Sequence, residues 1–187
     1  MRILLALGIV AAMLSGCAGP EDLPALEQDS ASAESYRLDT GDQLRVTVFN
    51  QAQLTGDYKV GADGTISMPL IGEVSARGQT TGELEQALMR RLSVEKNLLV
   101  DPSVSVQVEA YRPFFILGEV MNPGQYPCPY ETTVFSAVAI AGGFTYRART
   151  DYVSITRRID SRRVERRADR DSIIQPGDVI FVYERYF

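Results

Sequence analysis

The phrase Ile-Gly-Glu-Val-Ser-Ala-Arg-Gly-Gln at residues 71–79 returns in altered form as Leu-Gly-Glu-Val-Met-Asn-Pro-Gly-Gln at residues 117–125. Each copy ends an apolar extended run, turns at a glycine and leads toward a helical pattern opened by paired threonines, Thr80-Thr81 and Thr132-Thr133. A repeated phrase indicates that one supersecondary unit is used twice. The repeat therefore predicts two strand–turn–helix units, one in each half of the folded region.

The composition is that of a globular protein, with 187 residues of which 45% are hydrophobic and 23% charged. This length predicts one domain or two small ones. The formal net charge of −5 argues against nucleic-acid binding. The sequence contains no histidine, the commonest general base and metal ligand. It also shows no nucleophile–base pair, phosphate-binding loop or metal-ligand cluster, so we expect no enzyme, no catalytic residue, no cofactor and no metal.

The first sixteen residues are typical of a bacterial signal peptide. Arg2 supplies a positive charge, and residues 3–14 form an apolar stretch too short to cross a bilayer of about 30 Å as a helix. The stretch closes with Leu14-Ser15-Gly16-Cys17, which resembles the lipobox of bacterial lipoproteins. The resemblance implies lipid attachment at Cys17. Because alanine rather than aspartate follows the cysteine, it also implies a lipid anchor on the periplasmic face of the outer membrane.

The segment after the lipobox differs in composition from the rest of the chain. Residues 18–35 contain five acidic residues, no basic residue and no aromatic residue. Such a segment buries too little apolar surface to order itself, so we expect an acylated flexible tether over residues 17–35. With Cys17 acylated, Cys128 has no disulfide partner. It lies between two prolines with no basic neighbour in sequence, which favours a small apolar filler over a reactive thiol.

The first half of the folded region is predicted to contain strands followed by a helix. Alternation over residues 43–48 predicts a half-buried strand, and Asp63-Gly64 predicts a hairpin turn between strands at 58–60 and 65–68. The helix begins with Thr80 and Glu83 at capping-box spacing. Its core stripe comprises Leu84, Leu88 and Leu92.

The second half repeats this mixture. We expect a strand at 114–118, a helix from about 133 to 141 ended by Gly142-Gly143, and a hairpin formed by residues 152–158 and 162–167. A second, shorter repeat is also present: Gly41-Asp42 and Gly177-Asp178 each precede a strand pattern. Together the patterns predict an α+β protein with two small β-rich domains, each with one short helix packed on a sheet.

These landmarks together resemble the outer-membrane polysaccharide export (Wza-type) lipoprotein family. The first domain is similar to the family's polysaccharide export sequence domain at Tyr36-Arg37-Leu38-Asp39-Thr40-Gly41-Asp42, Pro69-Leu70-Ile71-Gly72 and Asp101-Pro102-Ser103-Val104. The second is similar to its β-grasp-like soluble-ligand-binding (SLBB) domain at Leu117-Gly118-Glu119-Val120, Ala141-Gly142-Gly143-Phe144 and Pro176-Gly177-Asp178. The expected domains are a signal peptide at 1–16, a tether at 17–35, the export sequence domain at 36–110 and the SLBB domain at 111–187.

The resemblance implies a component of capsular or exopolysaccharide export that forms a homo-oligomeric ring, as a conduit or adaptor below an outer-membrane pore. The implied partners are the exported polysaccharide and an inner-membrane polysaccharide co-polymerase. Long family members carry a further β-grasp domain and a C-terminal amphipathic helix that builds the pore, whereas this sequence ends at Tyr186-Phe187 after a strand pattern. We therefore expect a separate protein, an outer-membrane β-barrel, to cross the membrane. The alternative is an envelope glycan-binding lipoprotein that forms no conduit.

Arginines dominate the charge of the last third of the chain. Nine lie between residues 147 and 170, against four acidic residues. Three interpretations stay open: a solvated hairpin with local ion pairs, a contact with a neighbouring subunit, and a contact with an acidic glycan. The candidate contact residues are Arg157, Arg158, Arg162, Arg163, Arg166 and Arg167.

Two further candidate features are better explained by structure than by function. Aromatic side chains gather in the second unit and could stack on sugars, but strand alternation sends many of them into the core. Glu73 and Glu119 could be imagined as paired catalytic carboxylates. They occupy equivalent positions in the repeat, so matched roles in turns explain them better.

Overall fold

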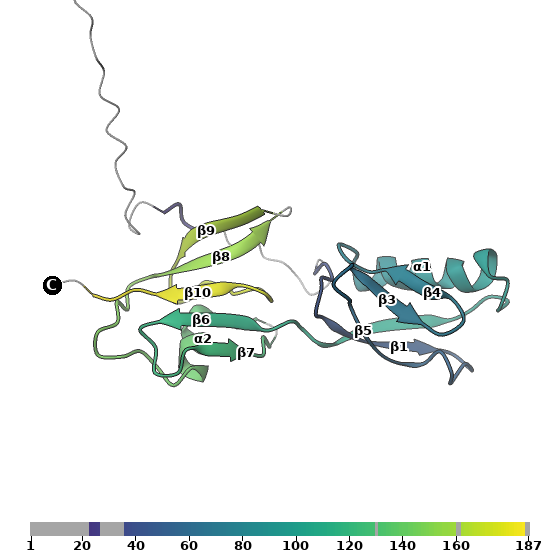
Figure 1. The fold of residues 1–187 in the computed structure, drawn as a ribbon, viewed down its shortest axis with the longest axis horizontal. Coiled ribbons are helices and arrows are strands. Elements are labelled where there is room, and N and C mark those ends of the chain that lie inside the picture. Colours follow the sequence, from purple (N-terminus) through teal and green to yellow (C-terminus); the bar gives the residue numbers. More distant parts are fainter. Residues whose placement is uncertain (1–22, 27–35, 130, 160–161, 186–187) are drawn as a thin grey trace, which may run out of the picture.

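The computed structural model describes residues 23–26, 36–129, 131–159 and 162–185. In these residues the chain forms two β-rich lobes side by side along the long axis of the molecule, joined near residue 112 (Figure 1). Each lobe has its own cluster of buried hydrophobic side chains. The α+β class expected from the sequence is confirmed. The expected signal peptide and Cys17 lie outside the described residues.

The first lobe combines two small antiparallel sheets with one helix. One sheet has the order β2-β1-β5 and the other pairs β3 with β4. Helix α1 lies along β5 and continues into a π-helical turn, η3 (Figure 1). The elements are β1 (Gln43–Val48), β2 (Gly56–Lys59), β3 (Thr65–Met68), β4 (Gly72–Ser75), α1 (Thr81–Arg90), η3 (Arg91–Glu95) and β5 (Val104–Ala110).

Helix α1 begins as its sequence predicts. The backbone N–H of Glu83 donates to the Thr80 hydroxyl (3.2 Å), and the Thr80 N–H donates to the Glu83 carboxylate (2.8 Å). This capping box satisfies two of the N–H groups left free at a helix start. The predicted leucine stripe is confirmed, since Leu84, Leu88 and Leu92 are all fully buried.

The hairpin predicted around Asp63-Gly64 is wrong in its pairing. The turn itself forms, and the N–H of Gly61 donates to the carbonyl of Thr65 (2.8 Å). The flanking strands then separate, because β2 pairs with β1 while β3 pairs with β4. A turn motif specifies the local reversal of the chain, but the choice of strand partner depends on long-range packing.

The second lobe contains a five-stranded mixed sheet in the order β7-β6-β10-β8-β9. Strands β6 and β10 are parallel and the other neighbours are antiparallel. Helix α2 covers one face, where its residues share a core with Phe114, Ile116 and Ile180. The predicted arginine hairpin is confirmed as β8–β9. The elements are β6 (Phe114–Gly118), β7 (Gly124–Tyr126), α2 (Val134–Ile140), β8 (Val153–Ile159), β9 (Arg162–Ala168) and β10 (Val179–Val182).

The repeated phrase does not form two equal strand–turn–helix units. In the first copy the phrase itself is strand β4, and α1 follows directly after the next turn. In the second copy the phrase starts where β6 ends, and an additional strand, β7, precedes α2. What the copies share is local: Gly72 and Gly118 both have positive φ (76° and 88°), and Val74 and Val120 are both buried.

Residues 23–26 correct the expectation of a flexible tether. The N–H of Leu26 donates to the carbonyl of Arg167 (2.7 Å), and the N–H of Arg167 donates to the carbonyl of Pro24 (2.9 Å). Ala25 thereby forms a parallel bridge with Arg167 at the free edge of β9, and Leu26 packs against the core of the second lobe. The composition of residues 17–35 did not predict this contact, because main-chain groups make the hydrogen bonds and Leu26 supplies the apolar contact.

Candidate functional site

The two Gly-Asp turns noted in the sequence have the same geometry. The N–H of Asp39 donates to Asp42 (2.8 Å) just before β1, and the N–H of Gln175 donates to Asp178 (2.7 Å) just before β10. Both aspartates are buried, with 0% and 1% of their surface exposed. A buried carboxylate that accepts a backbone N–H fixes the turn from which the strand starts.

Arg112 lies between these two turns. Its N–H donates to Asp42 (2.9 Å), and its guanidinium donates to the hydroxyl of Tyr36 (2.8 Å). On the other side its side chain lies against Gly177, where an added Cβ would come within 2.6 Å of the Arg112 Nε. Gly41 and Gly177 have positive φ (98° and 87°) and leave room for the arginine. The Arg112 side chain therefore contacts the turn before β1 in the first lobe and the turn before β10 in the second lobe.

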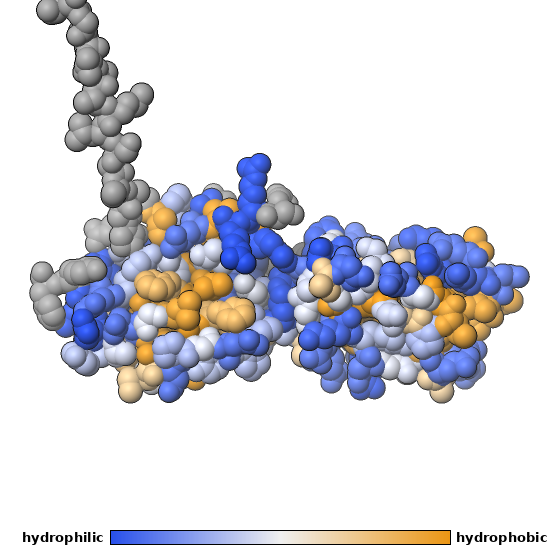
Figure 2. Space-filling view, in the orientation of Figure 1, coloured by the Kyte–Doolittle hydropathy of each residue, from blue (hydrophilic) through white to orange (hydrophobic). Residues whose placement is uncertain are grey.

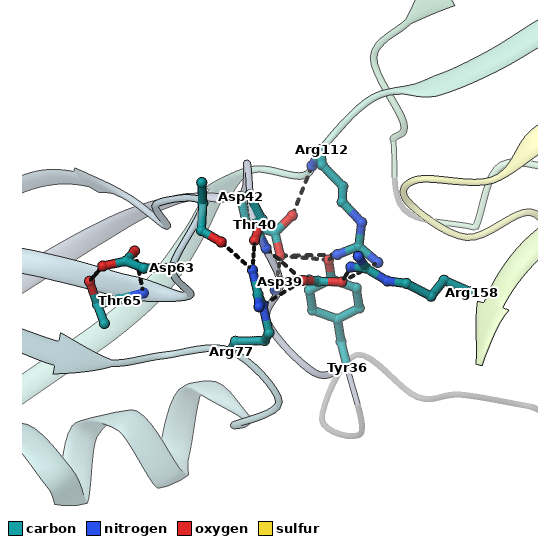
Figure 3. A network of polar contacts seen from close by, with 10 residues as sticks. Tyr36, Asp39, Thr40, Asp42, Asp63, Thr65, Arg77, Arg112 and Arg158 are labelled. Atoms are coloured by element: carbon teal, nitrogen blue, oxygen red, sulfur yellow. Dashed lines mark hydrogen bonds and ion pairs between the residues drawn. The ribbon is translucent and has the colours of Figure 1, made fainter. Parts of the chain in front are cut away.

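Asp39 is the second centre of this cluster. Its carboxylate pairs with Arg77 (3.3 Å), with Arg112 (3.8 Å) and with Arg158. Figure 3 shows Arg158 reaching Asp39 from the second lobe, whereas Arg77 comes from the first. We call these residues the interlobe cluster: Tyr36, Asp39, Asp42, Arg77, Arg112 and Arg158.

Burial shifts the pKa of two groups in this cluster. It raises the pKa of Asp42, while hydrogen bonds from Arg112 and Tyr36 act in the opposite direction. Burial and the adjacent Asp42 raise the pKa of Tyr36 strongly, so its hydroxyl stays protonated and donates to Asp42 (2.7 Å). The charged groups of the cluster therefore join the two lobes.

The sequence alone did not single out Arg112 or Tyr36 as site residues. The signal that could have indicated them was the repeated Gly-Asp turn. It marked two points where strands begin, with Arg112 in the connection between the lobes.

The six candidate arginines of the β8–β9 hairpin do not form one surface. Arg157 is buried and its Nη2 lies 2.7 Å from a carboxylate oxygen of Asp178. In the strand register Arg158 pairs with Arg163, and Arg167 pairs with Ser154, which places these three arginines on the sheet face opposite α2. Arg162 and Arg166 lie on the face that Arg157 shares.

The surface arginines differ in their partners. Arg158 is half exposed and pairs with Asp39 in the first lobe. The guanidinium of Arg167 lies 4.2 Å from the ring centre of Tyr152. Arg162 and Arg163 are exposed near the tip of the hairpin. The hairpin thus combines an interlobe contact, local packing and solvated charge.

Cys128 is buried in the core of the second lobe. Burial, with a smaller effect from Asp178, raises the pKa of its thiol to about 11. These observations agree with its interpretation as an apolar filler. Glu119 of the second lobe accepts a hydrogen bond from the Thr145 hydroxyl. Glu73 lies in β4 of the first lobe, where it pairs with Ser67 of β3. The two glutamates therefore belong to different lobes and do not share a site.

Among the described residues no group of three or more cysteine, aspartate and glutamate side chains could hold a metal ion. Nor does that part of the chain contain a helix long and apolar enough to cross a membrane.

Two family models match the chain, one on each lobe. Residues 30–109 match the family described as polysaccharide biosynthesis/export protein, and residues 113–168 match the SLBB domain. The interlobe cluster draws residues from both matched ranges, and Arg112 lies between the two ranges. The chain thus contains a polysaccharide biosynthesis/export domain followed by an SLBB domain.

Curated relatives carry names of the same kind. The exopolysaccharide production protein ExoF of Rhizobium meliloti (strain 1021) is 37% identical over 123 residues, which cover 60% of this chain and 29% of the relative. The EPS I polysaccharide export outer membrane protein EpsA of Ralstonia solanacearum is 28% identical over 150 residues, covering 66% of this chain and 39% of the relative. The EpsA protein of Ralstonia nicotianae is 29% identical over 139 residues. The matched part of this chain thus spans about a third of the length of these relatives.

Proposed function

We propose that this protein is a component of an exopolysaccharide or capsule export machine at the periplasmic face of the outer membrane. The observation that carries the proposal is the order of the two domains, an export domain followed by an SLBB domain. The names of the relatives describe production and export of exopolysaccharide, and this supports a transport role rather than catalysis.

The interlobe cluster supports a mechanical role in this machine. Asp39 and Asp42 of the first lobe bind Arg112 at the connection and Arg158 of the second lobe. Charge-assisted hydrogen bonds in a partly buried setting hold two domains in one orientation more firmly than exposed ion pairs do. A rod of two fixed domains is a suitable building block for the wall of a passage.

Attachment through a lipid on Cys17 would place the second lobe nearest the membrane. Only six peptide units separate Cys17 from Leu23, and a fully extended chain of six residues spans at most about 20 Å. Because residues 24–26 are bonded to β9, the lipid anchor cannot lie far from that edge. The first lobe then points away from the membrane along the axis seen in Figure 1.

The proposed partners follow from this placement. Several copies form a homo-oligomeric ring that passes polysaccharide toward an outer-membrane pore. The first lobe faces an inner-membrane polysaccharide co-polymerase, and a separate outer-membrane protein provides the spanning element. Weak contacts along the wall suit this role, since a tightly bound polymer would not move.

Deletion of the gene tests the proposed function. Loss of surface polysaccharide with accumulation of polymer in the periplasm supports export, and complementation by the intact chain restores it. Normal surface polysaccharide would contradict the proposal, and altered polymer length would favour a processing enzyme instead. Native mass spectrometry of the purified lipoprotein separates the ring from the alternative, a monomeric envelope protein that binds glycan without forming a conduit.

A further inference from the structure

The five-stranded sheet of the second lobe has an apolar outer face. Phe115, Leu117 and Phe181 alternate with buried residues on β6 and β10 and so point away from α2. Their side chains are 39%, 44% and 42% exposed. Figure 2 shows this hydrophobic patch in the middle of the second lobe, over the strands that face the viewer in Figure 1. We call these three residues the sheet face.

Helix α2 has a second apolar surface on the opposite side of the lobe. Its buried side chains Val134, Ala137 and Val138 face the sheet, which leaves Phe135 and Ile140 outward with 55% and 45% exposure. The helix contains no charged residue. Ser136 is the one polar residue of this helix, so its outward side is also largely apolar, and such a side is normally covered.

Two neighbouring side chains extend this surface past both ends of the helix. Ile173 is 41% exposed and forms a bridge with Thr133, the residue before α2. Met121 is 60% exposed and its N–H donates to Gly143 after α2. We call this surface the helix face, consisting of Met121, Phe135, Ile140 and Ile173.

We propose that the sheet face of one copy of this chain packs on the helix face of the next copy. Each copy offers two different apolar surfaces on opposite layers of one domain. A single kind of contact between copies covers both surfaces, whereas a single partner of another kind would cover only one. Such a head-to-tail contact closes into a ring when the rotation between copies permits it. The inference rests on the proposed ring and specifies the surfaces that build it.

The charges around the two faces are complementary. Arg158, Arg163 and Arg167 border the sheet face, with Glu165 as the one acidic residue among their described neighbours on β9. Three acidic residues outnumber one exposed basic residue around the helix face, Arg170, whose carbonyl accepts the N–H of Phe135. They are Glu131, Asp169 and Asp171, and all three are exposed. A basic border meeting an acidic border favours one orientation of the two copies and disfavours contact between like faces.

The size of the two faces suits a stable contact. Large apolar side chains that are about half exposed each offer roughly 80 Å² of surface, judged from the 150–250 Å² of a whole aromatic side chain. The seven side chains of the two faces together then supply roughly 550 Å² of apolar area. This amount is adequate for the central part of a standard interface of about 1,600 Å², which is polar at its rim.

Cross-linking of single-cysteine copies tests the geometry. Two variants of the mature lipoprotein, each with Cys128→Ala, carry either Leu117→Cys on the sheet face or Ile140→Cys on the helix face. With a short bis-maleimide we expect a mixture of the two variants to give cross-linked dimers. We expect each variant alone to stay uncross-linked, like the Cys128→Ala parent that controls for Cys17. Efficient cross-linking of either variant with itself would overturn the head-to-tail arrangement.

Light scattering on the same samples distinguishes the failure of this inference from the failure of the ring. If an oligomer is present but the mixture of variants is not cross-linked, the proposed surfaces are wrong and the proposed ring is retained. A monomer at all concentrations overturns both.

Substitution of the faces gives a second measure. Phe181→Ser and Phe135→Ser should each raise the concentration needed for assembly at least tenfold, and circular dichroism checks that both variants are folded. The matched control is Val100→Ser, a 97% exposed apolar residue of the first lobe, which should leave assembly unchanged within about twofold. Equal weakening by the control, or unchanged assembly of both face variants, would contradict the proposal.

Discussion

Asp42 and Asp178 hold the two strand-launching turns of the protein in the same way. Each carboxylate accepts the N–H of the residue three positions before it, at 2.8 and 2.7 Å. Each also pairs with an arginine, Asp42 with Arg112 and Asp178 with Arg157. The two pairs differ in setting, because the first joins the lobes and the second is enclosed in one lobe. This difference leads to separate predictions for the two aspartates.

Removal of the Asp178 carboxylate should destabilise the second lobe. Asp178→Ala leaves Arg157 buried without its partner and the N–H of Gln175 without an acceptor. Breaking a buried pair on one side costs about 3–5 kcal/mol of unfolding free energy. Urea denaturation followed by circular dichroism measures the loss. The double variant Asp178→Ala with Arg157→Met should regain a large part of it, because no buried charge is left alone. A double variant less stable than Asp178→Ala would contradict this account.

Removal of the Asp42 carboxylate should weaken both the first lobe and its connection to the second. Asp42→Ala leaves the N–H groups of Asp39 and Arg112 without their acceptor, and we expect a loss of about 2–4 kcal/mol in the same denaturation assay. Limited proteolysis should show new cleavage near Arg112. The matched control is Asp57→Ala in an exposed pair with Arg45, which should cost less than about 1 kcal/mol. Equal effects of the two substitutions would rule out the proposed role of the buried site.

Features of the fold set by neighbouring residues could be predicted from the sequence. The capping box at Thr80, the leucine stripe of α1 and η3, and the β8–β9 hairpin all involve segments close in sequence, and all are confirmed. The pairing of β2 with β1 could not be derived, because a turn motif does not determine which strands meet across the sheet.

The candidate site shows the same limit. The repeated Gly-Asp pair predicted both turns correctly. The role of Arg112 could not be predicted, because it depends on the fold bringing Gly41 and Gly177 to the same side chain from opposite ends of the folded region. Nor does the sequence distinguish the buried Arg157 from the exposed Arg158 next to it. That distinction required the strand register, which places the two side chains on opposite faces of the sheet.

The contact between residues 24–26 and β9 should be detectable by hydrogen exchange. The N–H of Arg167 donates to the carbonyl of Pro24, so it should exchange slowly in the intact chain. Pro24 provides only its carbonyl, and Leu26→Asp should disrupt the docked segment by placing a charge against the apolar core. We expect exchange at Arg167 to accelerate at least tenfold in this variant. The N–H of Val153, inside the sheet, should stay protected as the control, and unchanged exchange at Arg167 would contradict the docking.

The thiol of Cys128 should be unreactive in the folded protein. Burial raises its pKa from 9.0 to about 11, so the folded state favours the neutral thiol and lowers the thiolate fraction at pH 8 about 100-fold. Alkylation by iodoacetamide at pH 8, followed by mass spectrometry, should be at least 100-fold slower in the folded chain than in urea. The raised pKa also makes the stability of the fold depend on pH. Its contribution to the free energy of unfolding is present below pH 9 and is lost as the pH rises through about 11. Rapid alkylation of the native thiol would contradict this burial.

The repeated phrase itself allows a matched comparison between Gly72 and Gly118. Both residues have positive φ, but an added Cβ at Gly72 meets nothing within 4 Å, whereas at Gly118 it would lie 2.1 Å from the carbonyl oxygen of Val182. Gly72→Ala should therefore cost only the backbone strain, about 1–2 kcal/mol. Gly118→Ala adds a clash with the parallel neighbour β10 and should cost more than about 3 kcal/mol. Urea denaturation of the two variants decides between these outcomes. Equal losses would mean that the close approach of β6 and β10 at Gly118 does not constrain the sheet.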